Sequence, residues 1–228
     1  MISPDMDPAF AGIYQRCRTA TMTSCERAYA LYQAVRYLTD AGIDGAFVEC
    51  GVWKGGSVMI MAETLRLIGA APRDLVLYDT FNGMTQPGER DIALTGESAA
   101  SLLATADPDD PASIWCKTSL EEVRRTVAST GYPMERVHFV PGPVEETLPA
   151  AAPETIALLR LDTDWYDSTR HELVHLFPRL RPGGVLIIDD YGHWSGAKQA
   201  VDEYFSSTGL HILLNRIDYT GRIGIKCK

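Results

Sequence analysis

Aspartates follow two of the apolar, strand-like runs in the sequence. Asp162 comes directly after residues 156–161, and Asp189 and Asp190 come after residues 185–188. If these runs are neighbouring parallel strands, their carboxyl ends meet at one sheet edge and the three carboxylates converge there. Carboxylates at such short distances repel each other unless protons or a cation neutralise them. Hard oxygen ligands without a Cys or His cluster suit Mg²⁺, with Mn²⁺ or Ca²⁺ as alternatives, so we expect all three to form a metal site. The simpler interpretation is that these aspartates cap a turn or are solvated.

A second group of residues suits a cofactor. The sequence ECGVWKGGS at residues 49–57 has glycines that let the backbone approach a ligand beside a helix N-terminus. Its spacing differs from the GxGxxG of dinucleotide sites and from a P-loop. Asp79 ends the next strand-like run, where a carboxylate can accept hydrogen bonds from ribose hydroxyls. Glu49 lies in a buried-looking run and needs a cationic partner, for which the ammonium group of S-adenosylmethionine is one candidate. A structural turn at Gly51 and an N-cap at Asp79 are the alternatives.

Strand-like and helix-like runs alternate along the chain and would position these groups. The expected strands are residues 46–51, 74–79, 136–140, 156–161 and 185–188. Helices are expected between them, and their alternation predicts an α/β fold with a doubly wound, mostly parallel sheet. Residues 211–217 and 222–226, separated by the sequence DYTG, predict a C-terminal hairpin that adds an antiparallel strand at the sheet edge.

Capping residues mark three of the expected helices. The pattern S/T-x-x-E begins at Thr23, Ser119 and Thr169. Residues 1–21 are polar and irregular, and residues 82–119 form a long polar stretch of the kind that makes a lid or a disordered segment. We expect one domain over residues 1–228, with an N-terminal helical or lid segment at about 1–40 and a substrate-loop insertion at about 82–119.

Composition excludes several classes of protein. A length of 228 residues fits one α/β domain, and the net charge of −9 argues against sequence-independent binding of nucleic acid. The N-terminus does not resemble a signal peptide, and the longest apolar stretches are strand-sized, so no membrane span is expected. The five cysteines are scattered without CxxC spacing, which favours a cytoplasmic protein with free thiols.

Four motifs together resemble the macrocin O-methyltransferase family. They are VECGVWKGGS at 48–57, LYDTF at 77–81, LDTDWY at 161–166 and IIDDYG at 187–192. The resemblance runs from about Met22 to the C-terminus and implies a seven-stranded, Rossmann-like class I methyltransferase sheet. It also implies S-adenosylmethionine as the methyl donor and a Mg²⁺ that chelates vicinal oxygens of a sugar. Known members methylate deoxysugar hydroxyls in antibiotic pathways, so the resemblance implies a glycoside substrate and a homo-oligomer.

The resemblance also assigns roles by position. The matching metal ligands are Asp162, Asp189 and Asp190. The matching cofactor contacts are Glu49, Gly51, Ser57 and Asp79, with Gly142 and Val144 in a turn near the adenine and Thr23 and Ser24 in a segment that closes over the cofactor. Thr163 stands where many members have glycine.

The implied reaction transfers a sulfonium methyl group in line to a sugar hydroxyl that the metal makes more acidic. Asp162 is the expected general base, and His193 is the reserve candidate. Acceptor selectivity is expected from the 82–119 insertion and from aromatic residues at the two aspartate motifs, namely Trp165, Tyr191, His193 and Trp194.

Three alternatives remain open. The same scaffold and metal suit a catechol O-methyltransferase. A nicotinamide-dependent oxidoreductase uses a similar sheet, but the glycine spacing and the paired aspartates fit it poorly. A non-catalytic binding protein on the same fold would lack metal ligands, whereas Asp162, Asp189 and Asp190 are all present.

Overall fold

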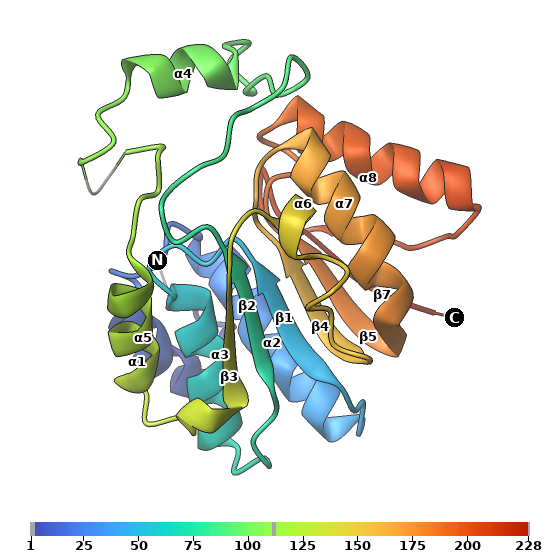
Figure 1. Ribbon diagram of the computed structural model, residues 1–228. Helices are drawn as coiled ribbons and strands as arrows, with labels where there is room; N and C mark the ends of the chain where they lie inside the picture. Colours follow the sequence, from blue (N-terminus) through green and yellow to red (C-terminus); the bar gives the residue numbers. More distant parts are fainter. Residues whose placement is uncertain (1–2, 111–112, 228) are drawn as a thin grey trace.

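The computed structural model describes residues 3–110 and 113–227, within which seven strands form one sheet (Figure 1). The strand order is β3-β2-β1-β4-β5-β7-β6, with β1 to β5 parallel and β7 antiparallel to both of its neighbours. The strands are β1 (Ala46–Cys50), β2 (Leu75–Asp79), β3 (Val137–Pro141), β4 (Ile156–Leu161), β5 (Leu180–Ile188), β6 (Asn215–Arg216) and β7 (Arg222–Ile225). The predicted doubly wound, mostly parallel sheet with an antiparallel C-terminal hairpin is confirmed.

The hairpin lies at the sheet edge, as predicted, but it adds two strands instead of one. Strand β7 pairs with β5, and the two-residue β6 forms the edge itself. The reason is polarity, because Ile223 and Ile225 pair with the apolar end of β5 whereas β6 consists of the exposed pair Asn215 and Arg216. A short, polar edge strand is the usual protection of a sheet against further pairing.

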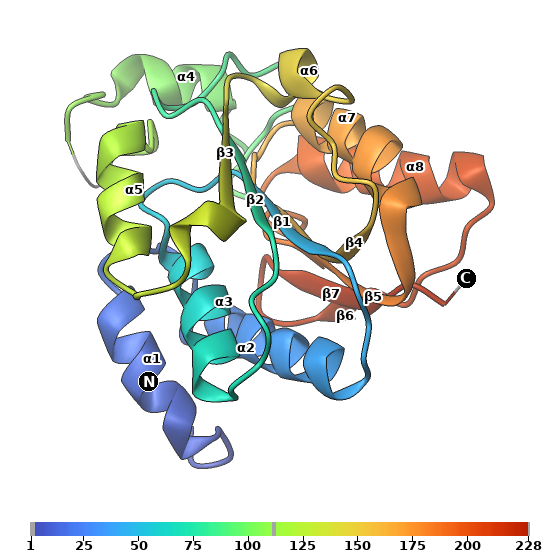
Figure 2. The ribbon, with the colours of Figure 1, turned by 60° about the horizontal axis from the view of Figure 1, so that its bottom comes forward.

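Helices cover both faces of the sheet (Figure 2). One face carries α1 (Pro8–Cys17), α2 (Cys25–Asp40), α3 (Gly56–Leu67) and α5 (Leu120–Ala128), and the other carries α6 (Val144–Thr147), α7 (Tyr166–Leu176) and α8 (Ser195–Thr208). Short 3₁₀ helices at Met134–Arg136 and Phe177–Arg179 precede β3 and β5. Among the described residues, no helix has both the length and the apolar character needed to cross a membrane.

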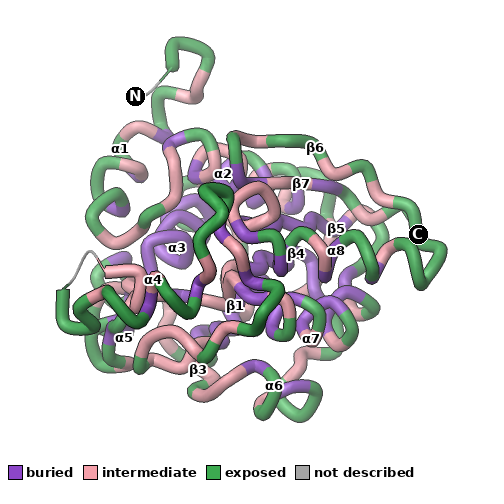
Figure 3. The backbone as a smooth tube through the Cα atoms, turned by 90° about the horizontal axis from the view of Figure 1, so that it is seen from above, coloured by how far each residue is buried: buried purple, intermediate pink, exposed green. Residues whose placement is uncertain are grey.

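Two apolar cores lie on the two faces of the sheet. Alternate strand residues point to opposite faces, so Phe47 joins the core under α2 and α3 while Val48 and Cys50 join the core under α7 and α8. Seen from above, buried backbone gathers at the centre of the molecule and exposed residues surround it (Figure 3). The parallel strands are therefore fixed in position by apolar packing on both faces of the sheet.

Helix α1 lies in the segment that we expected to be irregular. Asp7 caps it by accepting a hydrogen bond from the Ala9 amide, with Pro8 as its first residue. Its buried residues Phe10, Ile13 and Cys17 have helical spacing. The sequence contains both the Asp-Pro start and this spacing, but we predicted no helix here because the segment is short and the residues around it are polar.

Of the three predicted capping boxes, the one at Ser119 is confirmed. At the start of α2 the cap is Ser24, one residue later than predicted, because the Thr23 hydroxyl accepts a hydrogen bond from Arg160 instead. Thr169 lies inside α7 and caps nothing, since that helix begins three residues earlier. Capping patterns alone therefore located a helix start once in three.

The described part of the insertion, residues 82–110 and 113–119, packs against the domain and contains α4 (Ala99–Thr105). Asp91 within it is buried and accepts hydrogen bonds from the amides of Gly88 and Tyr166, at 2.7 and 2.8 Å. The Trp165 indole donates to the Thr85 carbonyl at 3.1 Å. A small third core between α4 and the starts of α7 and α8 joins the insertion to the sheet edge, so its inner half is a fixed roof over that edge.

Candidate active site

A cavity of about 390 Å³ opens at the carboxyl edge of the sheet. Its walls come from residues 20–23, from the turn after β1, from the insertion and from the ends of β4 and β5. Five of the predicted cofactor residues line it, namely Thr23, Glu49, Gly51, Ser57 and Asp79. The three predicted metal ligands, Asp162, Asp189 and Asp190, also line it.

The other predicted cofactor residues lie elsewhere. Gly142 and Val144 line a smaller neighbouring cavity of about 60 Å³, which shares Gly51 and Asp79 with the first. Ser24 lines neither cavity, because its hydroxyl caps α2 and donates to Asp218. The two adjoining cavities therefore unite most of the predicted cofactor residues, with Ser24 outside.

The turn after β1 requires glycine at two positions. Gly51 has a φ of +82°, and a Cβ there would lie 1.9 Å from the Asp162 carbonyl oxygen. Gly56 donates its amide hydrogen to the Ala20 carbonyl at 2.9 Å, and a Cβ there would lie 2.5 Å from that oxygen. Glycine thus lets the turn approach both the end of β4 and the segment at 20–23.

Asp79 holds this turn in place. Its two carboxylate oxygens accept hydrogen bonds from the amides of Val52, Trp53 and Phe81, at 2.6, 3.0 and 2.7 Å. Burial raises the pKa of Asp79, and these three bonds oppose that shift. The side chain therefore has a structural function at the floor of both cavities, and its predicted contact with a ribose stays a prediction.

Glu49 is buried, and its cationic partner is Arg160 of β4. Arg160 donates to Glu49 Oε1 at 2.6 Å. The expected need for a ligand ammonium group is therefore met in part by the protein itself. Oε2 of Glu49 has no hydrogen-bond partner among the described residues, and burial raises the pKa of Glu49 to about 7 against the opposing effect of Arg160. One polar atom at the cavity thus still lacks a partner.

Arg160 is one of two site residues that the sequence interpretation missed, and Asp164 is the other. The side chain of Arg160 is 2% exposed, and it also donates to Asp162 and Asp189, at 2.5 Å each, and to Thr23 at 3.0 Å. The signal was an arginine in the otherwise apolar run IALLRL between two strands with acidic ends. A buried arginine requires carboxylate partners.

The structure groups the aspartates differently from the prediction. Asp189 does not converge with Asp162 and Asp190, because its Oδ1 accepts from Arg160 and its Oδ2 pairs with Arg27. Asp164 takes its place: one carboxylate oxygen from each of Asp162, Asp164 and Asp190 lies within 4.8 Å of the other two. We call these three residues the carboxylate cluster.

The carboxylate cluster has the properties of a cation site. Desolvation, reinforced by the neighbouring carboxylates, raises the pKa of Asp190 well above its ordinary value, and desolvation raises that of Asp164 as well. Asp164 also has a φ of 70°, which is uncommon outside glycine and typical of functional turns. An oxygen-only donor set of this kind suits Mg²⁺, Mn²⁺ or Ca²⁺.

The predicted acceptor residues divide into two groups. His193 and Trp194 line the cavity, and the imidazole contacts the Tyr219 hydroxyl at 3.4 Å. Burial and the nearby Arg27 lower the pKa of His193, so its imidazole is neutral near pH 7. Trp165 is 2% exposed in the third core, and Tyr191 hydrogen-bonds to Asp202 of α8 away from the cavity.

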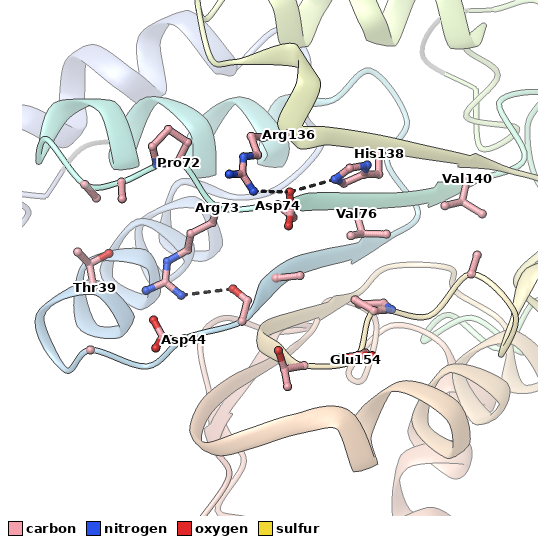
Figure 4. A pocket seen from close by; sticks show the side chains of 18 residues that line it. Thr39, Asp44, Pro72, Arg73, Asp74, Val76, Arg136, His138, Val140 and Glu154 are labelled. Atoms are coloured by element: carbon pink, nitrogen blue, oxygen red, sulfur yellow. Dashed lines mark hydrogen bonds and ion pairs between the residues drawn. The ribbon is translucent and has the colours of Figure 1, made fainter.

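A larger cavity of about 850 Å³ lies at the opposite, amino-terminal edge of the sheet (Figure 4). Three of its charged or titratable side chains pair with one another, since Asp74 contacts Arg136 and His138, at 3.3 and 3.0 Å. Arg73 donates to the Ile43 carbonyl at 2.6 Å. Ligands of open α/β sheets bind at the carboxyl edge, which favours the smaller cavity as the active site.

Comparison with known proteins identifies the family of the chain. The family model for Macrocin-O-methyltransferase (TylF) matches residues 12–223. The tetracenomycin 4'-O-methyltransferase of Streptomyces olivaceus, named for a dimethoxy-rhamnosyl substrate, is 34% identical over 96% of this chain and 80% of its own length. Demethyldecarbamoylnovobiocin O-methyltransferase of Streptomyces niveus is 34% identical over 88% and 73%, and mycinamicin III 3''-O-methyltransferase of Micromonospora griseorubida is 31% identical over 88% and 76%.

Solved structures show the same relationship. The O-methyltransferase NovP matches with a TM-score of 0.79 and 32% identity over 92% of this chain and 83% of its own. The calicheamicin methyltransferase CalS11 matches in fold, with a TM-score of 0.67 and 17% identity over 99% and 94%. The chain therefore belongs to the macrocin O-methyltransferase family and is an O-methyltransferase.

Proposed function

We propose that this enzyme transfers the methyl group of S-adenosylmethionine to a sugar hydroxyl of a glycosylated natural product, with a divalent cation such as Mg²⁺. The observation that carries the proposal is the carboxylate cluster, which borders the same cavity as Glu49 and the turn after β1. The names of the relatives support the acceptor, since one specifies a rhamnosyl group and two specify primed positions.

The residues on the cofactor side fit S-adenosylmethionine, which supplies a methyl group on a sulfonium sulfur. Oε2 of Glu49, buried and without a partner among the described residues, suits the ammonium group of the methionine part. Gly51 and Gly56 let the turn after β1 pack closely against the end of β4 and residues 20–23, and the start of α3 lines the cavity. Gly142 and Val144 would border the adenine in the smaller cavity.

On the acceptor side the carboxylate cluster would hold the cation, which supplies Lewis acidity that makes a hydroxyl easier to deprotonate. We assigned the general base to Asp162 from the sequence. In the structure its Oδ2 already accepts a hydrogen bond from Arg160, whereas Asp164 forms no ion pair with any described residue. We therefore propose Asp164 as the proton acceptor, with Asp162 as a ligand and the neutral imidazole of His193 as the reserve base.

Acceptor recognition would come from the roof and the rim of the cavity. Met84 and Ile114 of the insertion offer apolar surface, while His193 and Trp194 offer aromatic edges beside the cluster. A sugar ring has one apolar and one polar face, which suits such a mixed wall.

The proposal is tested by following release of S-adenosylhomocysteine from the purified chain. An aryl rhamnoside and a catechol are the competing acceptors, each with Mg²⁺ and with EDTA. We expect turnover of the rhamnoside only with Mg²⁺. Preferential turnover of the catechol would support the alternative acceptor class, and undiminished turnover in EDTA would contradict the role of the cation. Thermal shift with S-adenosylhomocysteine against NAD⁺ tests the cofactor separately.

Assembly is a further part of the proposal. The family resemblance led us to expect a homo-oligomer, and light scattering on the purified chain measures its mass directly. A mass of one chain over a wide range of concentrations would contradict that expectation.

A further inference from the structure

Residues from the two ends of the chain meet beside the active-site cavity. Residues 20–23, which we call the wall segment, form one side of the cavity. Residues 218–221, which we call the hairpin turn, connect β6 to β7 at the other end of the sequence. The Ser24 hydroxyl donates to Asp218 at 2.7 Å across 194 positions of sequence.

The wall segment contacts the domain through Ala20, which packs against the core, and through hydrogen bonds at both of its ends. Its carbonyl at Ala20 accepts a hydrogen bond from the Gly56 amide, and the Thr23 hydroxyl accepts one from Arg160. Met22, between them, is 55% exposed. The position of this segment therefore depends strongly on where the start of α2, immediately after it, is held.

Asp218 fastens the start of α2 to the hairpin turn. Its Oδ2 accepts from Ser24 and from Arg27 Nε, the latter at 2.9 Å. Its Oδ1 accepts from the amides of Thr220 and Gly221, at 3.0 and 2.7 Å. The side chain is only 14% exposed, so these four hydrogen bonds are largely shielded from solvent.

Arg27 extends this connection to the end of β5. Its guanidinium pairs with Asp218 through Nε and with Asp189 through a terminal nitrogen. Gly221 makes room for it, because a Cβ at that position would lie 2.7 Å from Arg27 Cδ and 2.8 Å from Cγ. The Thr220 hydroxyl also donates to the Asp189 carbonyl at 2.7 Å, so the turn sits firmly on the strand end.

We propose that Asp218 and Gly221 are positioning residues for cofactor binding, acting through Arg27 and Ser24 to hold the wall segment in its binding-competent place. The proposal rests on the proposed function, in that the cavity takes S-adenosylmethionine. Neither residue lines the cavity, so neither touches the cofactor there. If a smaller fraction of the molecules has the wall segment in its binding-competent place, the apparent affinity for the cofactor falls in proportion to that fraction.

The test compares Asp218→Asn and Gly221→Ala with Asp74→Asn. Asp218→Asn replaces one of the two carboxylate oxygens with an amide nitrogen, so the side chain can no longer accept from all four of its donors. Gly221→Ala removes no charge and only displaces Arg27. The control, Asp74→Asn, breaks an exposed carboxylate–arginine pair at the opposite sheet edge, away from the cavity (Figure 4). Affinity for S-adenosylhomocysteine is measured by titration calorimetry, and trypsin cleavage after Arg18 and after Arg27, which flank the wall segment, reports on its mobility.

We expect about tenfold weaker binding in both hairpin-turn variants, equivalent to loss of about one charged hydrogen bond. Cleavage of the wall segment should be faster in both, and saturating cofactor should restore kcat because only the apparent KM changes. The control should stay within about twofold of the wild type. Wild-type binding in both hairpin-turn variants would overturn the positioning role, whereas a wild-type protein that binds no S-adenosylhomocysteine would overturn the proposed function instead. If Asp218→Asn does not fold, Gly221→Ala alone decides the question.

Discussion

Asp189 and Asp190 are adjacent in sequence, yet they belong to two regions with opposite electrostatics. Asp189 faces two guanidinium groups, those of Arg27 and Arg160, and is part of a network in which the protein supplies its own cations. Asp190 faces Asp164 and Asp162 and forms no ion pair with the described residues. Successive residues at a strand end point in different directions, which separates the two carboxylates.

The difference shows which carboxylates are available for chemistry. A buried carboxylate with guanidinium partners is satisfied and has a structural role, because removing it leaves charge without compensation. A group of carboxylates without a cation is costly unless protons or a metal ion neutralise it. Asp162 belongs to both regions, since it accepts from Arg160 and lies in the carboxylate cluster. It therefore links the cofactor side of the cavity to the acceptor side.

The largest effect is expected from Asp164→Asn in the carboxylate cluster. Losing a proton acceptor should lower kcat by about a hundredfold to ten-thousandfold. Affinity for S-adenosylhomocysteine should change little, because the cofactor residues are untouched. Steady-state kinetics and calorimetry measure the two quantities, with Asp202→Asn on the surface of α8 as the matched control. A kcat near that of the control would remove Asp164 from the mechanism.

In the guanidinium network the corresponding change is Arg160→Met. It leaves Glu49, Asp162 and Asp189 without a shared cation, so the free energy of unfolding should fall by about 3–5 kcal/mol. Arg136→Met, in the exposed pair with Asp74, should cost less than about 1 kcal/mol. Urea unfolding followed by circular dichroism compares the two variants. Equal losses would mean that the network contributes no more than a surface pair.

The overall fold could be predicted because strand periodicity and strand-end residues are local properties of the sequence. The run at 156–161 matches β4 residue for residue, since its apolar pattern ends where the aspartates begin. The order of β6 and β7 was not predicted, because it depends on which hairpin strand pairs its isoleucines with β5. The packing of the inner half of the insertion on the sheet edge was missed because Asp91 and Trp165 hydrogen-bond to partners far away in sequence.

The location of the site could be predicted from the sequence, but the partner of each carboxylate in it could not. Sequence placed Glu49, Asp79, Asp162 and Asp190 at one sheet edge, and they do line one cavity. It could not divide the aspartates between metal and arginine, because that division depends on where the side chain of Arg160 lies. A buried cation inside a strand changes the role of every carboxylate around it.

A smaller effect should distinguish the two regions by their response to Mg²⁺. Desolvation raises the pKa of Asp164 and Asp190 in the folded state, so without a cation the folded protein holds more protons than the unfolded chain above about pH 4. Stability of the cation-free protein should therefore fall as the pH rises through the raised values. Mg²⁺ at about a hundredfold its Kd should add about 2.7 kcal/mol near pH 8, which is about 5–10 °C in Tm, and much less near pH 5. If Mg²⁺ shifts Tm equally at both pH values, or equally in Asp190→Asn and the wild type, the ion binds outside the carboxylate cluster.

The smallest effect is expected at Thr163, between the two aspartates of the fourth-strand motif. Its hydroxyl lies 2.9 Å from Oε1 of Glu172, which is fully buried, and 2.8 Å from the Ser168 hydroxyl. Thr163→Ala removes that partner and should lower the free energy of unfolding by about 1–3 kcal/mol, whereas Thr163→Ser keeps the hydroxyl and should cost less. Since Thr163 belongs to neither the guanidinium network nor the carboxylate cluster, kcat should stay within about threefold in both variants. A large loss of kcat in Thr163→Ala with unchanged stability would contradict this expectation. It would mean that the contact between Thr163 and Glu172 orients Asp162 and Asp164, so that Glu172 supports the carboxylate cluster.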